Sequence, residues 1–190
     1  MNTVAQQCCR KKQEEIKMKN EKIKNSAIIP GSFDPLTLGH LDVIERVSRL
    51  SDFDVVYVAL LINPDKNYLF DTETRVKIAE NACLGLPNVR VISDDGLLGS
   101  LCERLGTNVI IKGVRNARDF EYELKMAEWN KAHFPSVETL FLPCDPALSD
   151  ISSTRVRALL AEKKYDEAEK LLPRGTLHII TAENGGKKQK

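Results

Sequence analysis

The chain has 190 residues, of which 42% are hydrophobic, and its formal net charge is +1. This length and apolar content suit one domain with a single well-buried core. A nearly neutral charge provides no basic field for nucleic acid or for an anionic membrane, so neither is an expected partner. The longest apolar run, Val55 to Ile62, is far too short to span a bilayer, and the first residues lack the apolar core of a secretion signal.

The cysteines indicate a reducing compartment. They are scattered without the C-x-x-C spacing that is typical of zinc sites and redox motifs. A disulfide framework is equally unsupported by this spacing, so we expect a cytoplasmic protein with no metal site of its own. The five are Cys8, Cys9, Cys83, Cys102 and Cys144.

The two ends of the chain differ in composition from the middle. Residues 1–25 are dense in Lys, Glu and Gln and have no sustained apolar stripe, which predicts a flexible charged leader rather than a partner-binding segment. Residues 183–190 predict a second, disordered tail. The folded domain is therefore expected to span residues 26–182.

Between the ends, short apolar runs alternate with segments of helical periodicity. Strands are predicted at 27–29, 55–61, 89–92, 109–111 and 139–142. Helices are predicted at 41–50, 71–84, 97–105, 120–132, 152–161 and 165–172. Five apolar strands separated by helices favour right-handed crossovers and a buried parallel sheet. We therefore predict an α/β fold, a doubly wound five-stranded parallel sheet of Rossmann-like type.

Ligands of such sheets bind beyond the carboxyl ends of the strands. The first strand is followed by Pro30-Gly31-Ser32-Phe33-Asp34-Pro35-Leu36-Thr37-Leu38-Gly39-His40. Gly31 can adopt unusual backbone angles, and a helix opening at Gly39 and His40 offers free N–H groups to phosphate. This stretch therefore predicts a phosphate site.

Cations follow the other strands at the same edge. They are Lys66, Lys112 and Arg115, and a helix capped by Ser152 or Ser153 begins nearby. Together with His40 they predict a site for a polyphosphate and a second anion. The chain has neither G-x-G-x-x-G nor G-x-x-x-x-G-K-[ST], so a dinucleotide fingerprint and a P-loop are excluded.

Two stretches resemble the signatures of the nucleotidyltransferase superfamily. Thr37-Leu38-Gly39-His40 resembles its (H/T)-x-G-H motif, and Ile151-Ser152-Ser153-Thr154-Arg155-Val156-Arg157 resembles its I-S-S-T-x-x-R motif. Both occur in the right order, roughly 110 residues apart, which makes the pair more specific than either motif alone.

Within the superfamily, residues 27–154 most resemble the phosphopantetheine adenylyltransferase family. Thr37 stands where the nicotinate-nucleotide and cytidylyl enzymes carry a histidine, and residues 112–115 resemble an I-R-G-x-R segment. Residues 119–123, with Asn130, resemble a D-F-E-Y-E helix. The resemblance implies transfer of AMP from ATP to 4′-phosphopantetheine, which yields dephospho-coenzyme A and pyrophosphate in coenzyme A synthesis. It also implies Mg²⁺ that arrives with ATP, coenzyme A as a bound product or inhibitor, and a homohexamer.

The resemblance assigns roles to residues as well. His40 and Lys66 would be catalytic and would hold the α-phosphate while the acceptor phosphate attacks directly in line. The ATP site would be lined by Ser32, Phe33, His40, Gly113, Val114, Arg115, Glu123, Leu148, Ser149, Asp150, Ile151, Ser152, Ser153 and Thr154. The acceptor would contact Ser32, Lys66, Leu98 and Lys112.

Departures from the family pattern leave two other interpretations open. Lys112 replaces the usual arginine, so a bidentate fork becomes a point charge. Thr154 and Arg157 lean toward an adenylyltransferase for nicotinate or nicotinamide mononucleotide, which Thr37 and residues 120–123 disfavour. A non-catalytic nucleotide-binding protein is the third interpretation, and a scaffold would need none of His40, Lys66 and Ser153.

Overall fold

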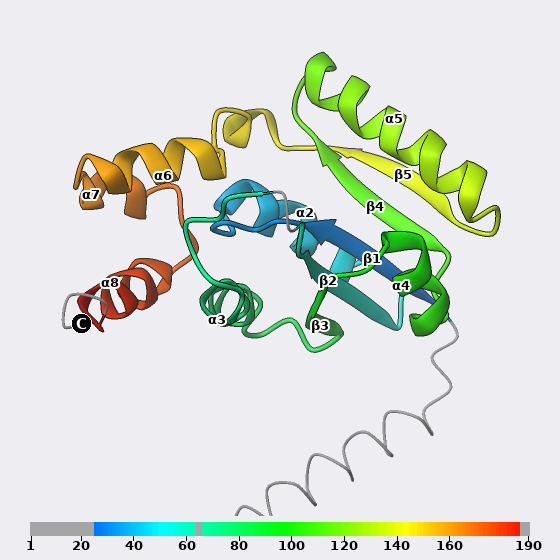
Figure 1. Cartoon of the computed structure of the whole chain (residues 1–190), viewed down its shortest axis with the longest axis horizontal. Helices are drawn as coiled ribbons and strands as arrows, with labels where there is room; N and C mark the ends of the chain where they lie inside the picture. The colour runs from blue at the N-terminus through cyan, green and yellow to red at the C-terminus, as the bar shows by residue number, and fades with distance from the viewer. Residues whose placement is uncertain (1–24, 64–65, 187–190) are drawn as a thin grey trace, which may run out of the picture.

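The computed structural model describes residues 25–63 and 66–186 (Figure 1). The predicted leader, residues 1–25, lies outside the described residues except for Asn25. The last four residues of the predicted tail, 187–190, also lie outside them.

The strands form a single five-stranded sheet in the order β3-β2-β1-β4-β5. Every neighbouring pair is parallel, which confirms the predicted α/β architecture. The strands are β1 (Ser26–Gly31), β2 (Val55–Leu61), β3 (Val89–Asp94), β4 (Val109–Val114) and β5 (Glu138–Pro143).

The helices follow the predicted alternation, and two of them begin at a side-chain cap. The Asp71 side chain accepts a hydrogen bond from the Thr74 amide, and Ser152 accepts one from the Arg155 amide. The helices are α2 (Leu38–Ser48), α3 (Thr72–Ala82), α4 (Leu98–Leu105), α5 (Ala117–His133), the 3₁₀ turn η1 (Pro146–Leu148), α6 (Ser153–Ala161), α7 (Tyr165–Glu169) and α8 (Thr176–Gly186).

Helices cover both faces of the sheet, and each face has its own core. On one face, Ile29 and Val58 pack with Ile44 of α2 and Ile78 of α3. On the other face, Ile28 and Tyr57 join a cluster that includes Leu101 of α4 and Val137. Alternate residues along β1 and β2 therefore point to opposite cores, as a strand buried on both faces requires.

The C-terminal helix α8 differs from the sequence prediction. The sequence predicts no helix or strand for residues 176–182 and a disordered tail from residue 183. The structure instead has a helix that continues through Gly186. Its residue Ile180 is fully buried in the first core cluster, and α8 lies beside α3 (Figure 1). A hydrogen bond from the Asn81 side chain to the Arg174 carbonyl holds the preceding turn against α3. Packing against α3 thus stabilises a helix that the sequence periodicity did not predict.

The strand order reverses direction between β1 and β4. From β1 the chain winds outward through β2 and β3, and from β4 it winds the opposite way to β5. Such a switch point leaves a crevice at the carboxyl ends of the two central strands. Gly113 in β4 allows α2 to approach there, because a Cβ at that position would lie 2.8 Å from Val43 Cγ2.

Candidate active site

His40 lies in the first turn of α2, at the carboxyl end of β1. The backbone N–H of Thr37, the N-cap residue, donates to Nδ1 of His40 at 3.1 Å. The Thr37 hydroxyl lies 3.0 Å from the same nitrogen. Because Nδ1 accepts the amide proton, the neutral ring carries its own proton on Nε2. The cap therefore fixes His40 as a hydrogen-bond donor through Nε2.

The surroundings keep this ring neutral. Burial lowers the pKa of His40 to about 4, and the positive charge of Arg115 acts in the same direction, partly opposed by Asp119. The Phe33 ring meets the imidazole edge to face, with centroids 5.2 Å apart. At neutral pH, His40 is thus uncharged: its Nδ1 accepts from Thr37, and its Nε2–H is the donor.

The two signature motifs, far apart in sequence, meet at this point. The Ser153 hydroxyl donates to the Pro35 carbonyl at 2.8 Å, and the Arg157 guanidinium donates to the Asp34 carbonyl at 2.7 Å. Gly39 faces the Ile151 carbonyl, which a Cβ at that glycine would contact at 3.7 Å. The start of α2 and the start of α6 therefore enclose one region at the switch point.

The N-terminus of α6 offers free donors in this region. Ser152 caps the Arg155 amide, and the Ser153 and Thr154 amides belong to the first turn, which has no intrahelical acceptors. Arg115 reaches the same loop, because its guanidinium donates to the Ile151 carbonyl at 3.3 Å and pairs with Asp119. This grouping of amides and one guanidinium suits a phosphate chain.

The side chains of Lys66 and Ser32 are in contact, although one residue follows His40 in the chain and the other precedes it. The Lys66 ammonium donates to Ser32 Oγ at 2.9 Å, and Lys66 is exposed. Ser32 directly follows β1, so this contact places the predicted catalytic lysine beside the carboxyl end of that strand.

Lys112 and Glu123 form an ion pair of 2.9 Å, with both side chains 19% exposed. The sequence placed Lys112 with the acceptor and Glu123 with ATP, so the structure brings together two residues assigned to different ligands. The pair links the end of β4 to the first half of α5.

Other predicted residues have packing partners in the structure. The Phe33 ring is buried and lies against Gly31, where a Cβ would approach Phe33 Cζ to 2.8 Å. That glycine therefore makes room for the Phe33 ring, and it is not one of the glycines with a positive φ angle. Leu98 begins α4 and packs against the second core cluster, and the Val114 carbonyl accepts the Cys144 amide. The ligand contacts of these residues stay predictions, as do those of the remaining positions, Leu148, Ser149 and Asp150.

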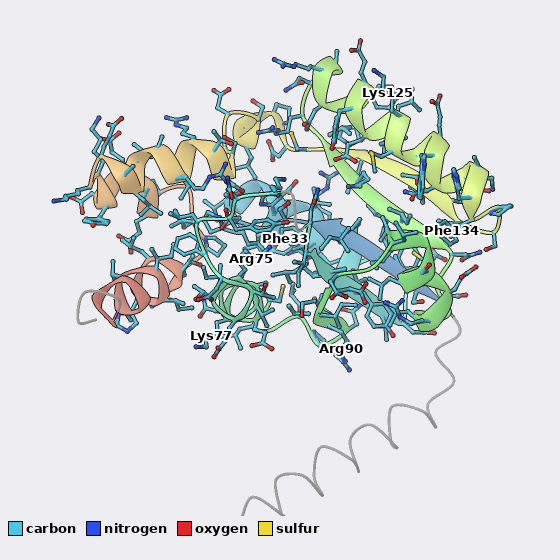
Figure 2. The ribbon with its side chains drawn as sticks, in the orientation of Figure 1. Phe33, Arg75, Lys77, Arg90, Lys125 and Phe134 are labelled. Carbon is cyan, nitrogen blue, oxygen red and sulfur yellow. The ribbon has the colours of Figure 1, made fainter. Side chains whose placement is uncertain are left out.

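Sequence reasoning missed the residues that support the site. Asp34 is buried, and its carboxylate accepts the amides of Leu69 and Phe70 at 2.8 and 3.0 Å. Arg75 is almost fully buried in α3 and donates to the Ser32 carbonyl. Figure 2 shows Phe33 and Arg75 near the centre of the molecule, whereas Lys125 lies at its periphery. A charged residue at a core position of the α3 pattern was the available signal for Arg75.

Two kinds of feature are absent from the described residues. They contain no group of three or more His, Cys, Asp or Glu side chains that could hold a metal ion. Within the same residues, no helix combines the length and the apolar composition that crossing a membrane requires.

Known proteins resemble this chain in sequence and in fold. Residues 28–159 match the family model described as cytidylyltransferase-like. The fold, with its two motifs at the switch point, defines a nucleotidyltransferase. A phosphopantetheine adenylyltransferase from Clostridium novyi is 46% identical over 134 residues, which are 70% of this chain and 82% of that protein. The chain therefore belongs to the cytidylyltransferase-like family and, within it, to the phosphopantetheine adenylyltransferases.

Solved structures share the fold. Thermotoga maritima TmcAL bound with alpha-thio ATP superposes with a TM-score of 0.64 at 14% identity, over 85% of this chain and 56% of that chain. This chain thus spans little more than half of that protein. Plasmodium falciparum nicotinic acid mononucleotide adenylyltransferase complexed with NaAD gives a TM-score of 0.61 at 18% identity, over 85% of this chain and 96% of that chain.

Proposed function

We propose that this protein transfers AMP from ATP to 4′-phosphopantetheine, giving dephospho-coenzyme A and pyrophosphate. The observation that carries the proposal is the fixed Nε2–H donor of His40, enclosed by the starts of α2 and α6. The identity of 46% to a phosphopantetheine adenylyltransferase supports this choice of acceptor over a pyridine mononucleotide.

The reaction needs positioning and charge stabilisation more than acid–base chemistry. The acceptor is already a phosphate anion, so it can attack the α-phosphorus directly in line without a general base. Enzymes accelerate such transfers mainly by orienting the reactants and stabilising charge on the transferred group. His40 suits this task because a neutral donor with a fixed proton needs no change of protonation during the reaction. Lys66 would add positive charge on the same group.

The triphosphate would lie at the start of α6, beside Arg115. Arg115 and the first-turn amides of Ser153 and Thr154 are the groups we assign to the β- and γ-phosphates. Mg²⁺ would enter as the ATP complex, since this ion keeps several waters and commonly binds through substrate phosphates. The same groups would hold the pyrophosphate as it departs.

The acceptor would lie on the opposite side. Ser32, Lys66 and Lys112 are the groups we assign to its phosphate, with Leu98 beside the pantetheine arm. Dephospho-coenzyme A and coenzyme A present the same arm, so both should compete with phosphopantetheine as product and inhibitor.

We also propose the homohexamer, supported by exposed apolar side chains on α5 and on the edge strand β5. Along α5, only Asn130 is buried, whereas Tyr122 is 66% exposed and Leu140 on the edge strand β5 is 52% exposed. A groove of about 490 Å³ runs between the two elements. Exposed apolar faces of this kind mark protein interfaces. The exposed large apolar residues there are Phe120, Tyr122, Leu124, Met126, Trp129 and Leu140.

We propose a cytoplasmic location, which the free thiols support. Cys83, Cys102 and Cys144 are all free, and burial raises the pKa of Cys83 and Cys102 to about 11. Such thiols are poor nucleophiles and pack as small apolar groups.

One experiment tests the proposed reaction. Purified protein is mixed with Mg²⁺ and ATP, and pyrophosphate release is measured with 4′-phosphopantetheine, with nicotinate mononucleotide or with no acceptor. We expect release with phosphopantetheine alone. Release only with the mononucleotide would establish the second interpretation, and ATP binding without release would establish the third.

A further inference from the structure

Lys66 is an exposed lysine whose side-chain position depends on two contacts. Its ammonium donates to Ser32 Oγ at 2.9 Å, and its backbone N–H donates to the Asn63 carbonyl at 3.1 Å. Holding a long flexible side chain in one place costs conformational entropy. A catalytic role for Lys66 therefore requires that both Ser32 and the backbone near Asn63 be fixed.

Tyr68 fixes the backbone near Asn63. The Tyr68 hydroxyl accepts the Asn63 N–H at 2.9 Å and donates to the Leu61 carbonyl at 3.3 Å. One phenol oxygen thus joins the end of β2 to the residue whose carbonyl holds Lys66. The tyrosine itself is only partly exposed.

Arg75 fixes both Tyr68 and Ser32. Its guanidinium carbon lies 3.9 Å from the centroid of the Tyr68 ring, which is cation–π geometry. The same guanidinium donates to the Ser32 carbonyl at 2.8 Å. Arg75 thus touches the residue that accepts from Lys66 and the residue that positions its backbone.

The Arg75 guanidinium contacts uncharged groups of Ser32, Thr72 and Tyr68. Its Nε is buried without a hydrogen-bond acceptor. Its Nη2 donates to the Thr72 hydroxyl at 3.1 Å. A buried cation held by a carbonyl, a hydroxyl and an aromatic face is costly to keep for stability alone.

We propose that Tyr68 and Arg75 are a positioning pair that sets Lys66 against Ser32. The proposal rests on the proposed role of Lys66 in transferring AMP. Arg75 holds the Ser32 backbone and the Tyr68 ring, and the Tyr68 hydroxyl holds the loop backbone from which Lys66 reaches the site. Neither member of the pair is assigned a contact with substrate.

The variant Tyr68→Phe isolates this function. It keeps the ring beneath Arg75 and removes only the hydroxyl. The far end of the loop stays anchored, because Asp34 still accepts the Leu69 and Phe70 amides. We expect kcat to fall about five- to tenfold, as the loss of one positioning hydrogen bond allows, while KM for ATP stays within about twofold. Tyr165→Phe on α7 is the matched control and should leave both values unchanged.

A double-mutant cycle tests whether Tyr68 acts through Lys66. If it does, Tyr68→Phe has no further effect on kcat once Lys66→Ala is present. A merely structural hydroxyl would lower kcat by the same factor in both backgrounds. Equal factors would overturn the proposal.

Acetylation provides a readout that does not depend on activity. Each protein is treated with a limiting amount of acetic anhydride, and the extent of modification at Lys66 is followed by peptide mass spectrometry. Lys66 should react faster in Tyr68→Phe and in Arg75→Lys than in wild type, with the other exposed lysines as internal references. An unchanged Lys66 rate in Tyr68→Phe would overturn the positioning pair. If wild type releases no pyrophosphate and the Lys66 rate still rises, the proposed reaction fails while the positioning pair stands.

Discussion

The ammonium of Lys112 lies 2.9 Å from Oε2 of Glu123, and this ion pair joins β4 to α5. A guanidinium could hold a carboxylate on one edge and a phosphate on the other. An ammonium is a single point charge with a flexible stem. If Lys112 binds the acceptor phosphate as proposed, it therefore shares or gives up Glu123.

Replacing Lys112 by alanine should weaken phosphopantetheine binding more than ATP binding. The acceptor loses a charge-assisted contact, which typically costs about 1.5–3 kcal/mol. Titration calorimetry with each ligand alone measures the two effects, and Lys112→Arg is the control that keeps the charge. A larger loss for ATP would mean that Lys112 belongs to the nucleotide half of the site.

Replacing Glu123 by glutamine should have opposite effects on the two ligands. Acceptor affinity should rise, by up to about 1 kcal/mol, because Lys112 no longer has a competing carboxylate. ATP affinity should fall if Glu123 contacts the nucleotide as the resemblance implies. The same calorimetry measures both, with Glu121→Gln on the exposed side of α5 as control. Unchanged acceptor affinity would show that the ion pair does not compete with the substrate.

Stability should fall with acidification in a way that depends on His40. The unfolded histidine titrates near its ordinary pKa of 6.5, whereas the folded pKa is about 4. Between these values the unfolded state binds the extra proton, so the free energy of unfolding decreases as the pH falls from about 6.5 to about 4. Urea melts of wild type and His40→Asn at pH 7.0 and pH 4.5 measure the difference. Equal losses in both proteins would mean that His40 titrates normally in the folded state.

The exposed apolar side chains of α5 and of the edge strand β5 should control assembly. Sedimentation of wild type at micromolar concentration should give a hexamer. Leu140→Glu places a charge on the uncovered edge strand and should reduce the assembly while leaving helix content unchanged by circular dichroism. Leu84→Glu, at another exposed apolar position, is the matched control. A wild-type monomer would refute the assembly.

The sequence alone predicted much of this fold because its strands are near-continuous apolar runs with clear caps between them. The Asp71 and Ser152 caps, and His40 at the opening of α2, follow directly from local chemistry. The helix α8 was missed because it is stabilised by packing on α3, which no local pattern reveals.

The candidate site was predictable in outline but not in its contacts. Motifs identified the residues at the edge of the sheet, yet the pairing of Lys112 with Glu123 depends on how α5 lies against β4. The contact between Arg75 and Ser32 likewise joins residues 43 positions apart. Side-chain partners of this kind are set by tertiary packing rather than by periodicity.

His40→Ala tests the central claim that a fixed neutral donor stabilises charge on the α-phosphate. Removing one such preorganised donor typically lowers kcat by roughly 10²–10³. ATP affinity should change little, because an interaction that forms in the transition state affects turnover rather than ground-state binding. His133→Ala, an exposed histidine stacked on Trp129, is the matched control.

The direct measurement is single-turnover formation of dephospho-coenzyme A by His40→Ala, together with its equilibrium dissociation constant for ATP. We predict a rate reduced by roughly 10²–10³ with ATP affinity near the wild-type value. A wild-type rate, or a rate and an ATP affinity that fall by the same factor, would contradict this role for His40.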